Sequence, residues 1–250
     1  MANDFYIKYL PVVDSTNNYL RYEREGLLSE AGDAKIIAVY AGEQTSGRGQ
    51  RGNVWYSAGD ENLLLSLLVR PGAVTVKEQF YLSQAIALAV NDAMHACGVN
   101  SVIKWPNDIY VGNRKLAGIL VELDYAGDMI DCAIVGVGIN VNQSQFPAMD
   151  KIPTSLFLLT GKDFDIEIVL KSLLTSFQYY YNMLENGETL KIAAEYKKYL
   201  VGYGKMLRYR DTFSIFNAVV KDVEGDGVLC LERESGELSR YYFKEVELLL

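Results

Sequence analysis

With 250 residues, half of them apolar, the chain can bury one substantial hydrophobic core and still form a small accessory module. A net charge of -8 and an isoelectric point near 4.8 mean that the overall electrostatic field repels nucleic acid, so DNA binding is not expected and an anionic ligand must be held by local cations. No apolar run reaches the roughly 18 residues of a membrane span, and the N-terminus lacks the pattern of a secretion signal, so the sequence predicts a cytoplasmic protein without a membrane partner.

The first predicted elements flank a glycine-rich loop. Ser15 or Thr16 can cap a short helix that ends at Gly26, and residues 35–44 alternate between apolar and polar positions as a strand does. After the loop, residues 62–70 form a continuous apolar run that is typical of a buried strand. We therefore expect a helix and two strands around one loop.

A long helix and several strands are predicted next. Thr75 and Glu78 have the spacing of a capping box, and apolar residues recur at helical spacing behind them until Gly98. Strands are predicted at residues 101–105, 109–111, 115–125 and 129–141, with tight turns at positions 112–113 and around position 127. Strands joined by tight turns are antiparallel, so we expect a mixed, largely antiparallel central sheet.

Two helices and a change of pattern complete the chain. Residues 165–186 predict a long amphipathic helix with Asp165 as its cap, and a further helix covers residues 188–200. Short alternating segments separated by glycine turns then predict a small closed β-module of about four or five strands. The expected fold class is α+β, with helices flanking the central sheet and with domains at residues 1–202 and 203–250.

The histidine and cysteine content argues against several kinds of site. His95 is the only histidine, and the three cysteines, Cys97, Cys132 and Cys230, lie far apart in the sequence. This pattern fits neither a disulfide framework nor a paired-cysteine metal site, and a Ser-His-Asp triad would have to be built on His95 alone. We expect the cysteines to be reduced core residues and His95 to have no catalytic role.

The loop between the first two strands contains the string GRGQRG, residues 47–52, which formally matches the GxGxxG pattern. A dinucleotide site needs these glycines to open a helix, whereas the β-prone residues 53–56 follow, and the other motifs of a protein kinase are absent from the sequence. Glycines let backbone N–H groups approach an anion, and Arg48 and Arg51 offer planar donor forks to phosphate or carboxylate oxygens. The string predicts a phosphate clamp; a flexible surface loop or an arginine-glycine nucleic-acid tract are the alternatives for the loop taken alone.

A second polar string, KWPND, follows a predicted strand at residues 104–108. It combines a cation, a rigid turn, an amide and a carboxylate, and Lys115 lies just beyond the next hairpin turn. In a hairpin, Lys104, Asn107, Asp108 and Lys115 can converge at one end of the sheet. A solvated turn with a buried tryptophan is the alternative interpretation, and the neighbouring phosphate clamp disfavours it.

Five strings in order resemble the biotin protein ligases. They are DSTN at 14–17, EQTSGRGQRGNVW at 43–55, KWPNDIY at 104–110, RKLAGILVE at 114–122 and GVGINV at 136–141. The likeness runs through the whole predicted catalytic portion, and the C-terminal β-module matches the SH3-like barrel in which these enzymes end. Because the chain reaches DSTN by residue 14, it resembles the monofunctional members that lack an N-terminal helix-turn-helix domain.

The resemblance implies the class II aminoacyl-tRNA synthetase-like fold of biotin and lipoate ligases and a reaction in two steps. The biotin carboxylate attacks the α-phosphate of ATP in the presence of Mg²⁺, and pyrophosphate leaves. A lysine amine of a biotin carboxyl carrier protein or carboxylase carrier domain then attacks the biotinyl-adenylate. Two anionic reactants meet in the first step, so fixed cations and Mg²⁺ lower its barrier, and no side-chain nucleophile is needed.

The resemblance also assigns roles to individual positions. The polar partners of the biotin rings would be Ser15, Thr16, Asn17 and Gln44. Gly118 and Leu120 would line the biotin pocket. The loop residues that close over the adenylate would be Gly47, Arg48, Gly49, Gln50, Arg51 and Trp55. The remaining residues that hold the nucleotide or act in catalysis would be Lys104, Asn107, Asp108, Lys115 and Asn140. Among these, Lys115 would neutralise the carboxylate and α-phosphate, Asn107 would help to hold nucleotide or Mg²⁺, and Asn140 would meet the adenine.

Two of these positions carry further hypotheses. Family members often have arginine where this chain has Gln50, so we expect a looser hold on the adenylate unless Arg51 substitutes for that residue. Asp108 lies beside Asn107 and is expected to orient or deprotonate the incoming lysine ammonium.

Two alternatives remain. A lipoate protein ligase or octanoyl transferase has a related fold and also acylates a carrier lysine, but its loop usually pairs arginines before a glycine triplet, unlike residues 47–52 here. A biotin-sensing scaffold without turnover is the non-catalytic alternative, and Gln50 is the feature that favours it. The sequence leaves open whether the chain forms a homodimer and which carboxylase is its acceptor.

Overall fold

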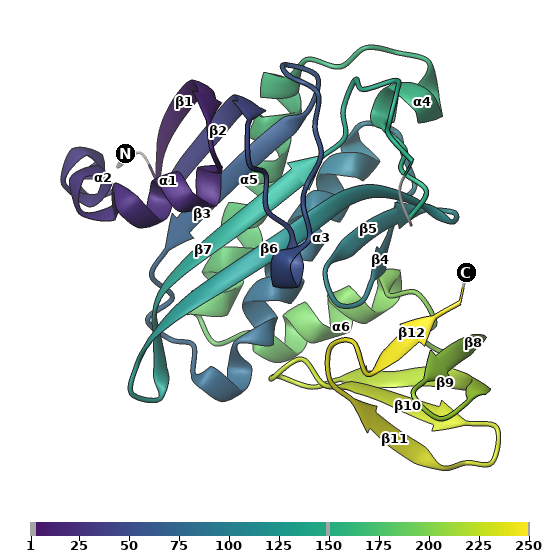
Figure 1. The fold of residues 1–250 in the computed structure, drawn as a ribbon. Coiled ribbons are helices and arrows are strands. Elements are labelled where there is room, and N and C mark those ends of the chain that lie inside the picture. Colours follow the sequence, from purple (N-terminus) through teal and green to yellow (C-terminus); the bar gives the residue numbers. More distant parts are fainter. Residues whose placement is uncertain (1–3, 149–150, 250) are drawn as a thin grey trace.

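The computed structural model describes residues 4–148 and 151–249, apart from the side chain of Arg51. Its main feature is a seven-stranded sheet in the order β1-β2-β3-β7-β6-β5-β4 (Figure 1). The strands are β1 (Phe5–Val13), β2 (Ile36–Gln44), β3 (Leu63–Val69), β4 (Val102–Lys104), β5 (Asp108–Val111), β6 (Arg114–Ala126) and β7 (Met129–Ile139). Only the β1–β2 pair is parallel among these neighbours, which confirms a mixed, largely antiparallel sheet.

One face of this sheet is covered by the long helices. The helices are α1 (Thr16–Tyr22), α2 (Arg24–Ala31), α3 (Phe80–Ala96), α4 (Leu156–Thr160), α5 (Ile166–Glu185) and α6 (Thr189–Tyr199), with 3-10 turns at Gln50–Gly52 and Val76–Glu78. Figure 1 shows α3 and α5 lying together behind β3, β6 and β7. Apolar side chains at alternate positions of these strands join the helices in the main core, because successive residues of a strand point to opposite faces.

The opposite face is closed by apolar packing at one end only. There α1 and α2 bury Leu20 and Leu27 against β2, β3 and β7 in a smaller core. Toward the other end, the same face of β6 and β7 presents Gly118, Gly136 and Gly138 instead of apolar side chains, and all three line a cavity. The sheet therefore has one fully packed face and one face that is left partly open beneath the loop that follows β2.

The C-terminal segment forms a second, antiparallel sheet in the order β11-β10-β9-β8-β12. Its strands are β8 (Met206–Asp211), β9 (Ile215–Val223), β10 (Leu229–Arg233), β11 (Leu238–Tyr241) and β12 (Val246–Leu248). The indole N–H of Trp105 donates to the carbonyl of Gly227 at 3.0 Å, and the ring of Phe243 lies 5.2 Å from that of Trp105. The α+β class with a small C-terminal β-module is thus confirmed, while the boundary at residue 203 stays a prediction.

Most predicted elements are present, but three details differ. β1 was not predicted, although it forms the edge of the main sheet and pairs with β2 from Phe5 onward. Gly26 does not end the first helix: α1 ends at Tyr22 and Gly26 lies inside α2, where burial of Leu27 outweighs the cost of a helical glycine. The predicted capping box of Thr75 and Glu78 is present, but it caps the 3-10 turn Val76–Glu78 rather than the start of α3.

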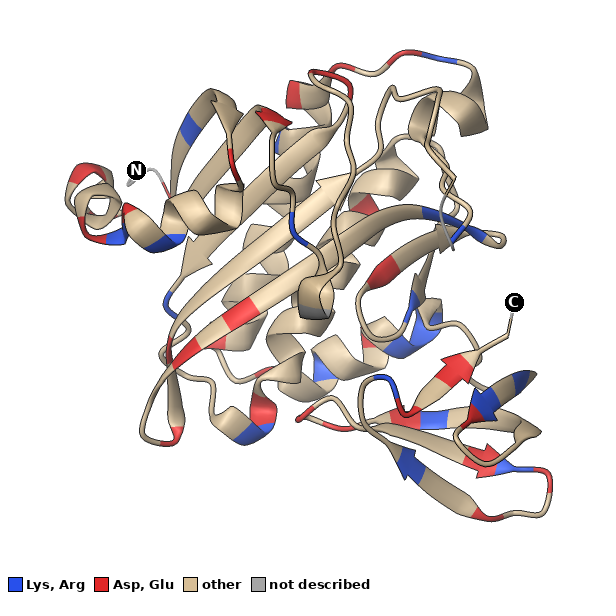
Figure 2. Ribbon diagram, in the orientation of Figure 1, with Lys and Arg blue, Asp and Glu red and all other residues tan. Residues whose placement is uncertain are grey.

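The cysteines are free, as predicted, but only Cys132 is fully buried; Cys97 and Cys230 are partly exposed, so the expectation that all three are core residues was wrong. His95 packs against the ring of Tyr199 at 5.3 Å, which is a structural contact. Figure 2 shows acidic and basic positions interspersed over both sheets, so no face of the ribbon carries a single charge. No helix among the described residues is long and apolar enough to cross a membrane.

Candidate active site

A cavity of about 450 Å³ opens between the glycine-bearing face of β6 and β7, the loop that follows β2 and the C-terminal module. This volume is within the range of small-molecule sites. Most of the residues singled out from the sequence line it: Ser15, Thr16, Asn17, Gln44, Arg48, Gly49, Gln50, Trp55, Lys104, Asn107, Asp108, Lys115, Gly118 and Leu120. Arg48 and Lys115 therefore face one and the same space.

Two predicted residues, Gly47 and Asn140, are not part of this lining. Gly47 lies behind it, where its carbonyl accepts from the N–H of Trp55 at 3.0 Å, and a Cβ at this position would lie 2.4 Å from the Trp55 carbonyl oxygen. Asn140 is buried and donates from Nδ2 to the carbonyl of Thr154 at 2.8 Å. The side chain of Arg51 lies outside the described part of the structure, so its proposed role is not addressed.

Hydrogen-bonding groups from α1 and β2 form one end of the cavity. Gln44 Oε1 accepts from both the N–H and the hydroxyl of Thr16, at 2.8 and 3.1 Å. Ser66 on β3 lies 2.6 Å from the Thr16 hydroxyl and donates to Asn17 Oδ1 at 2.5 Å. Sequence analysis did not single out Ser66, although a polar residue within the apolar run of β3 indicates a buried hydrogen bond. Ser15 precedes α1 without a side-chain capping bond, so its hydroxyl is not committed to the helix.

The floor of the cavity consists of glycines because larger residues would collide with the side chains above. A Cβ at Gly138 would lie 2.4 Å from Cε2 of Trp55, and one at Gly118 would lie 2.9 Å from the same ring. A Cβ at Gly136 would lie 2.4 Å from Asn17 Oδ1. The Trp55 indole N–H is buried without a hydrogen-bond partner among the described residues. Gly136 and Gly138 belong to the string GVGINV but were not assigned a role from the sequence.

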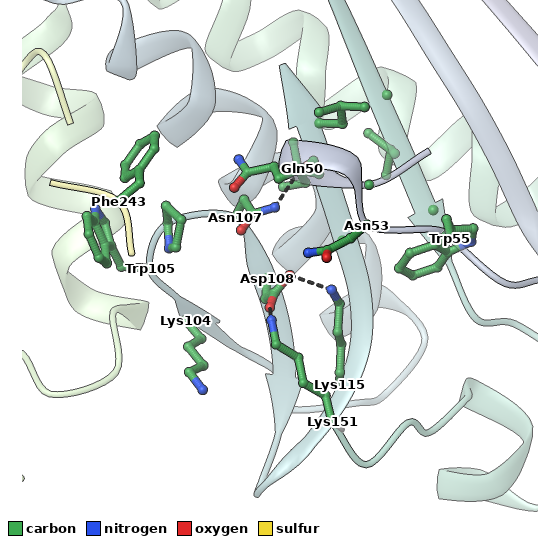
Figure 3. Close-up of a pocket in the computed structure, with 18 of the residues that line it drawn as sticks. Gln50, Asn53, Trp55, Lys104, Trp105, Asn107, Asp108, Lys115, Lys151 and Phe243 are labelled. Atoms are coloured by element: carbon green, nitrogen blue, oxygen red, sulfur yellow. Dashed lines mark hydrogen bonds and ion pairs between the residues drawn. The ribbon is translucent and has the colours of Figure 1, made fainter. Parts of the chain in front are cut away.

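Charged side chains gather at the other end (Figure 3). Asp108 is almost fully buried, and its two oxygens lie 2.6 Å from Lys115 Nζ and 2.6 Å from Lys151 Nζ. Burial opposes ionisation of Asp108, but the two lysines outweigh it and hold the pKa of this carboxyl below its usual range. Burial also lowers the pKa of Lys115 and of Lys104, whose Nζ lies 5.0 Å from the ring centre of Tyr110.

Arg48 is held by a carboxylate on β6. Its Nη2 lies 2.9 Å from Glu122 Oε1 and its Nη1 lies 2.9 Å from Asn18 Oδ1. Asn17 Nδ2 also donates to Glu122, at 2.8 Å, and Arg21 lies 3.3 Å from it. Burial alone would raise the pKa of Glu122, but Asn17 and the two arginines lower it below its usual range. In this arrangement the charge of Arg48 is balanced within the protein.

A metal would find few protein ligands in this cavity. Within the described residues, no group of three or more His, Cys, Asp or Glu side chains could hold a metal ion. Asn107 donates from Nδ2 to the carbonyl of Ile119 at 2.7 Å, which leaves its Oδ1 as the group able to contact a cation. Both oxygens of Asp108 are engaged by lysines. The donor set therefore fits Mg²⁺ only if the ion is carried mainly by the phosphates of a ligand.

The C-terminal module completes the wall of the cavity, which the sequence did not predict. Phe243, Lys244, Val246 and Glu247 line it, beside Trp105 of the KWPND turn. Lys151 also lines it, from the segment between β7 and α4. The four C-terminal residues and Lys151 belong to no recognised string, so nothing in the local sequence indicated their role.

Residues 9–140 match the profile of the Biotin/lipoate A/B protein ligase family, and this match covers more than half of the chain. The chain belongs to this family. Among its curated relatives within the family, the bifunctional ligase/repressor BirA of Bacillus spizizenii is 33% identical over 214 residues, which cover 84% of this chain and 65% of that protein. The biotin--[acetyl-CoA-carboxylase] ligase of Mycobacterium tuberculosis is 29% identical over 209 residues, covering 80% of this chain and 74% of that ligase.

Solved ligase structures extend the likeness beyond the family match. The biotin protein ligase of Aquifex aeolicus, in complex with biotin and ATP, superimposes with a TM-score of 0.78 and 26% identity over 97% of this chain and 98% of that one. The likeness therefore includes the C-terminal module. This ligase-family chain spans 65% of the length of the Bacillus relative.

Proposed function

We propose that the chain is an ATP-dependent biotin protein ligase that forms biotinyl-5'-AMP and transfers biotin to a specific lysine of a biotin carboxyl carrier protein domain. The observation that carries this proposal is the single cavity with hydrogen-bonding groups at one end, a glycine floor and a lysine cluster at the other end. A ligand with a polar ring system, an apolar body and a carboxylate matches this order of groups. Relatives that are named biotin ligases add support.

Biotin would lie along the glycine floor with its ureido ring at the polar end. Thr16, Asn17 and Gln44 line this end and offer donors and acceptors to a ureido group, and the buried Ser66 holds Thr16 and Asn17 from behind. The acyl chain would pass between Trp55 and the strand backbone at Gly118, so that the carboxylate reaches Lys115. Both ends of the ligand would then be fixed by charged or polar groups that the fold already positions.

In the first step a carboxylate oxygen of biotin attacks the α-phosphorus of ATP, and the bond from that phosphorus to the bridging oxygen of pyrophosphate breaks. Lys115 offsets the charge that accumulates between the two anions, and Asp108 keeps its Nζ in place. The loop carrying Arg48 would close over the product when the arginine exchanges Glu122 for the adenylate. Asn140 would contact adenine if Thr154 releases its amide. Mg²⁺ would enter with ATP, assisted by Asn107.

In the second step the neutral amine of the carrier lysine attacks the acyl carbon of the adenylate. The bond from that carbon to the phosphate oxygen breaks, AMP leaves, and the proton that the amine loses passes to solvent. Asp108 would orient the amine of that lysine. Since its two oxygens bind lysine ammonium groups and its pKa lies below the usual range, orientation is favoured over removal of a proton.

Asp108→Asn is expected to slow transfer from preformed biotinyl-adenylate to the carrier about tenfold, because a neutral amide oxygen accepts the N–H of the incoming amine less strongly than a carboxylate does. Single-turnover transfer would measure this effect separately from adenylate formation. The control is Asp163→Asn, at an exposed position outside the cavity, which should leave the transfer rate unchanged. A transfer rate equal to that of the wild type would remove Asp108 from the second step.

Gln50→Arg is expected to slow the release of bound adenylate about tenfold, because it adds a charged donor to the loop that lines the cavity. The measurement is the dissociation rate of labelled biotinyl-adenylate from the wild type and the variant, after unreacted ATP is removed. Equal rates in the two proteins would contradict the proposed contact between position 50 and the adenylate phosphate.

A side-by-side assay with labelled biotin and labelled lipoate tests the function itself. With Mg²⁺ and ATP, we expect biotin-dependent release of pyrophosphate and labelling of the carrier domain by biotin but not by lipoate. Preference for lipoate would favour the lipoate ligase alternative, and biotin binding without pyrophosphate release would favour the biotin-sensing scaffold. The cytoplasmic location and the lack of a DNA-binding role stay predictions.

A further inference from the structure

Lys151 lines the cavity, although its segment of the chain belongs to none of the recognised strings. Its Nζ lies 2.6 Å from Asp108 Oδ2, and its side chain lines the same space as Lys115 and Lys104. The backbone fixes this position, because the N–H of Lys115 donates to the carbonyl of Ile152 at 2.8 Å and the N–H of Thr154 donates to the carbonyl of Lys115 at 2.9 Å. The segment that carries Lys151 therefore pairs with the start of β6 through the residues that follow Lys151.

The local charge balance shows why a second lysine on Asp108 matters. Asp108 neutralises one of its two lysine partners, and Glu122 balances Arg48 at the far end of the loop. Lys244 and Glu247 of the C-terminal module also line the cavity and contribute one charge of each sign. Lys151 and Lys104 thus give this end of the cavity an excess of positive charge within a protein whose net charge is -8. Burial first, and then the nearby Lys151, lower the pKa of Lys104. The electrostatic repulsion among these lysine side chains falls when an anion binds between them.

The two partners of Asp108 differ in how deeply they lie. The Lys115 side chain is 20% exposed and approaches the glycine floor at Gly118, whereas the Lys151 side chain is 55% exposed. The inner lysine is positioned for the carboxylate and the α-phosphate. The outer one can leave Asp108 without stranding the buried carboxylate, because Lys115 remains bound to it, and it can then meet groups that extend toward solvent.

We propose that Lys151 binds the polyphosphate of ATP beyond the α-phosphate. This proposal rests on the proposed ligase function. Lys151 makes no covalent bond. As the α-phosphorus to oxygen bond breaks, negative charge grows on the departing pyrophosphate, and the ammonium group of Lys151 stabilises it there.

Lys151→Met is expected to raise the KM for MgATP in biotin-dependent pyrophosphate release about tenfold, since a charge-assisted contact is lost. It should also weaken inhibition by inorganic tripolyphosphate by a similar factor, while the Kd for biotin measured by calorimetry stays within twofold. Lys162→Met, which removes an exposed lysine outside the cavity, is the matched control and should change none of these quantities. Lys151→Arg, which keeps the positive charge, should retain the wild-type KM for MgATP.

The outcomes separate this proposal from the function on which it rests. A wild-type protein that releases no pyrophosphate would overturn the ligase function. An active wild type with an unchanged KM for MgATP in Lys151→Met would overturn the role of Lys151 alone. A variant that loses biotin binding as strongly as ATP binding would show that Lys151 acts only by positioning Asp108. If Lys151→Met failed to fold, Lys151→Gln, which keeps a polar contact to Asp108, would give the same comparison.

Discussion

Replacing Lys115 by methionine is expected to lower the rate of biotin-dependent pyrophosphate release by about three orders of magnitude. Lys115 Nζ lies 2.6 Å from Asp108 and 5.4 Å from the ring centre of Trp55, at the inner end of the lysine cluster. A cation at this depth acts in a site with little water, where it offsets far more charge than it would on the surface. Initial rates at saturating biotin and MgATP would measure the loss.

The neighbouring cation offers a matched control for this variant. Arg114 begins β6, is exposed and does not line the cavity, so Arg114→Met should change the rate by less than twofold. Lys115→Met should still fold, because Lys151 remains as a partner for the buried Asp108. Thermal unfolding would verify this. A well-folded variant that keeps a tenth or more of the wild-type rate would show that Lys115 does not neutralise the reacting anions.

The parts of the fold that sequence reasoning recovered are those with strong local patterns. The hairpin turn at Gly112, the cap of α5 at Asp165 and the continuous apolar strand β3 occur as predicted, because turn chemistry, capping and burial leave their mark on adjacent residues. β1 was missed for the opposite reason. It is an edge strand with exposed residues such as Ile7, it contains Pro11, and it gains its hydrogen bonds from a parallel partner more than twenty residues away.

The residues of the candidate site also divide into those that the local sequence predicted and those that it did not. Residues within the recognised strings, such as Gln44, Asp108 and Lys115, were placed in one cavity because the strings lie at adjoining strand and loop ends. Lys151 and Phe243 were missed because their positions depend on contacts with Lys115 and Trp105 that only the folded chain creates. Long-range pairing of this kind has no counterpart in the spacing of residues along the sequence. It also explains why the partner of Arg48, Glu122, was not foreseen although it ends a recognised string.

Gly138→Val is expected to weaken biotin binding about hundredfold by closing the floor of the cavity. Gly138 lies within β7 with extended backbone that valine adopts readily, so the effect is steric rather than conformational. Its Cβ would lie 2.4 Å from Cε2 and 2.7 Å from Nε1 of Trp55, and the branched side chain would extend further into the space assigned to the ligand. The indole would have to leave the floor, and the contact surface for the acyl chain would be lost with it.

Calorimetric titration with biotin in the absence of ATP would measure this loss. Gly26→Val is the matched control, because Gly26 lies in α2 with no atom within 4 Å of an added Cβ, and biotin affinity should be unchanged. Since the floor at position 138 holds Trp55 and not the lysines, tripolyphosphate should inhibit any residual adenylation by Gly138→Val as strongly as it inhibits the wild type. Biotin affinity within threefold of the wild type in a folded Gly138→Val protein would mean that the ligand does not lie on β7, and that the polar groups of α1 bind something other than its ring.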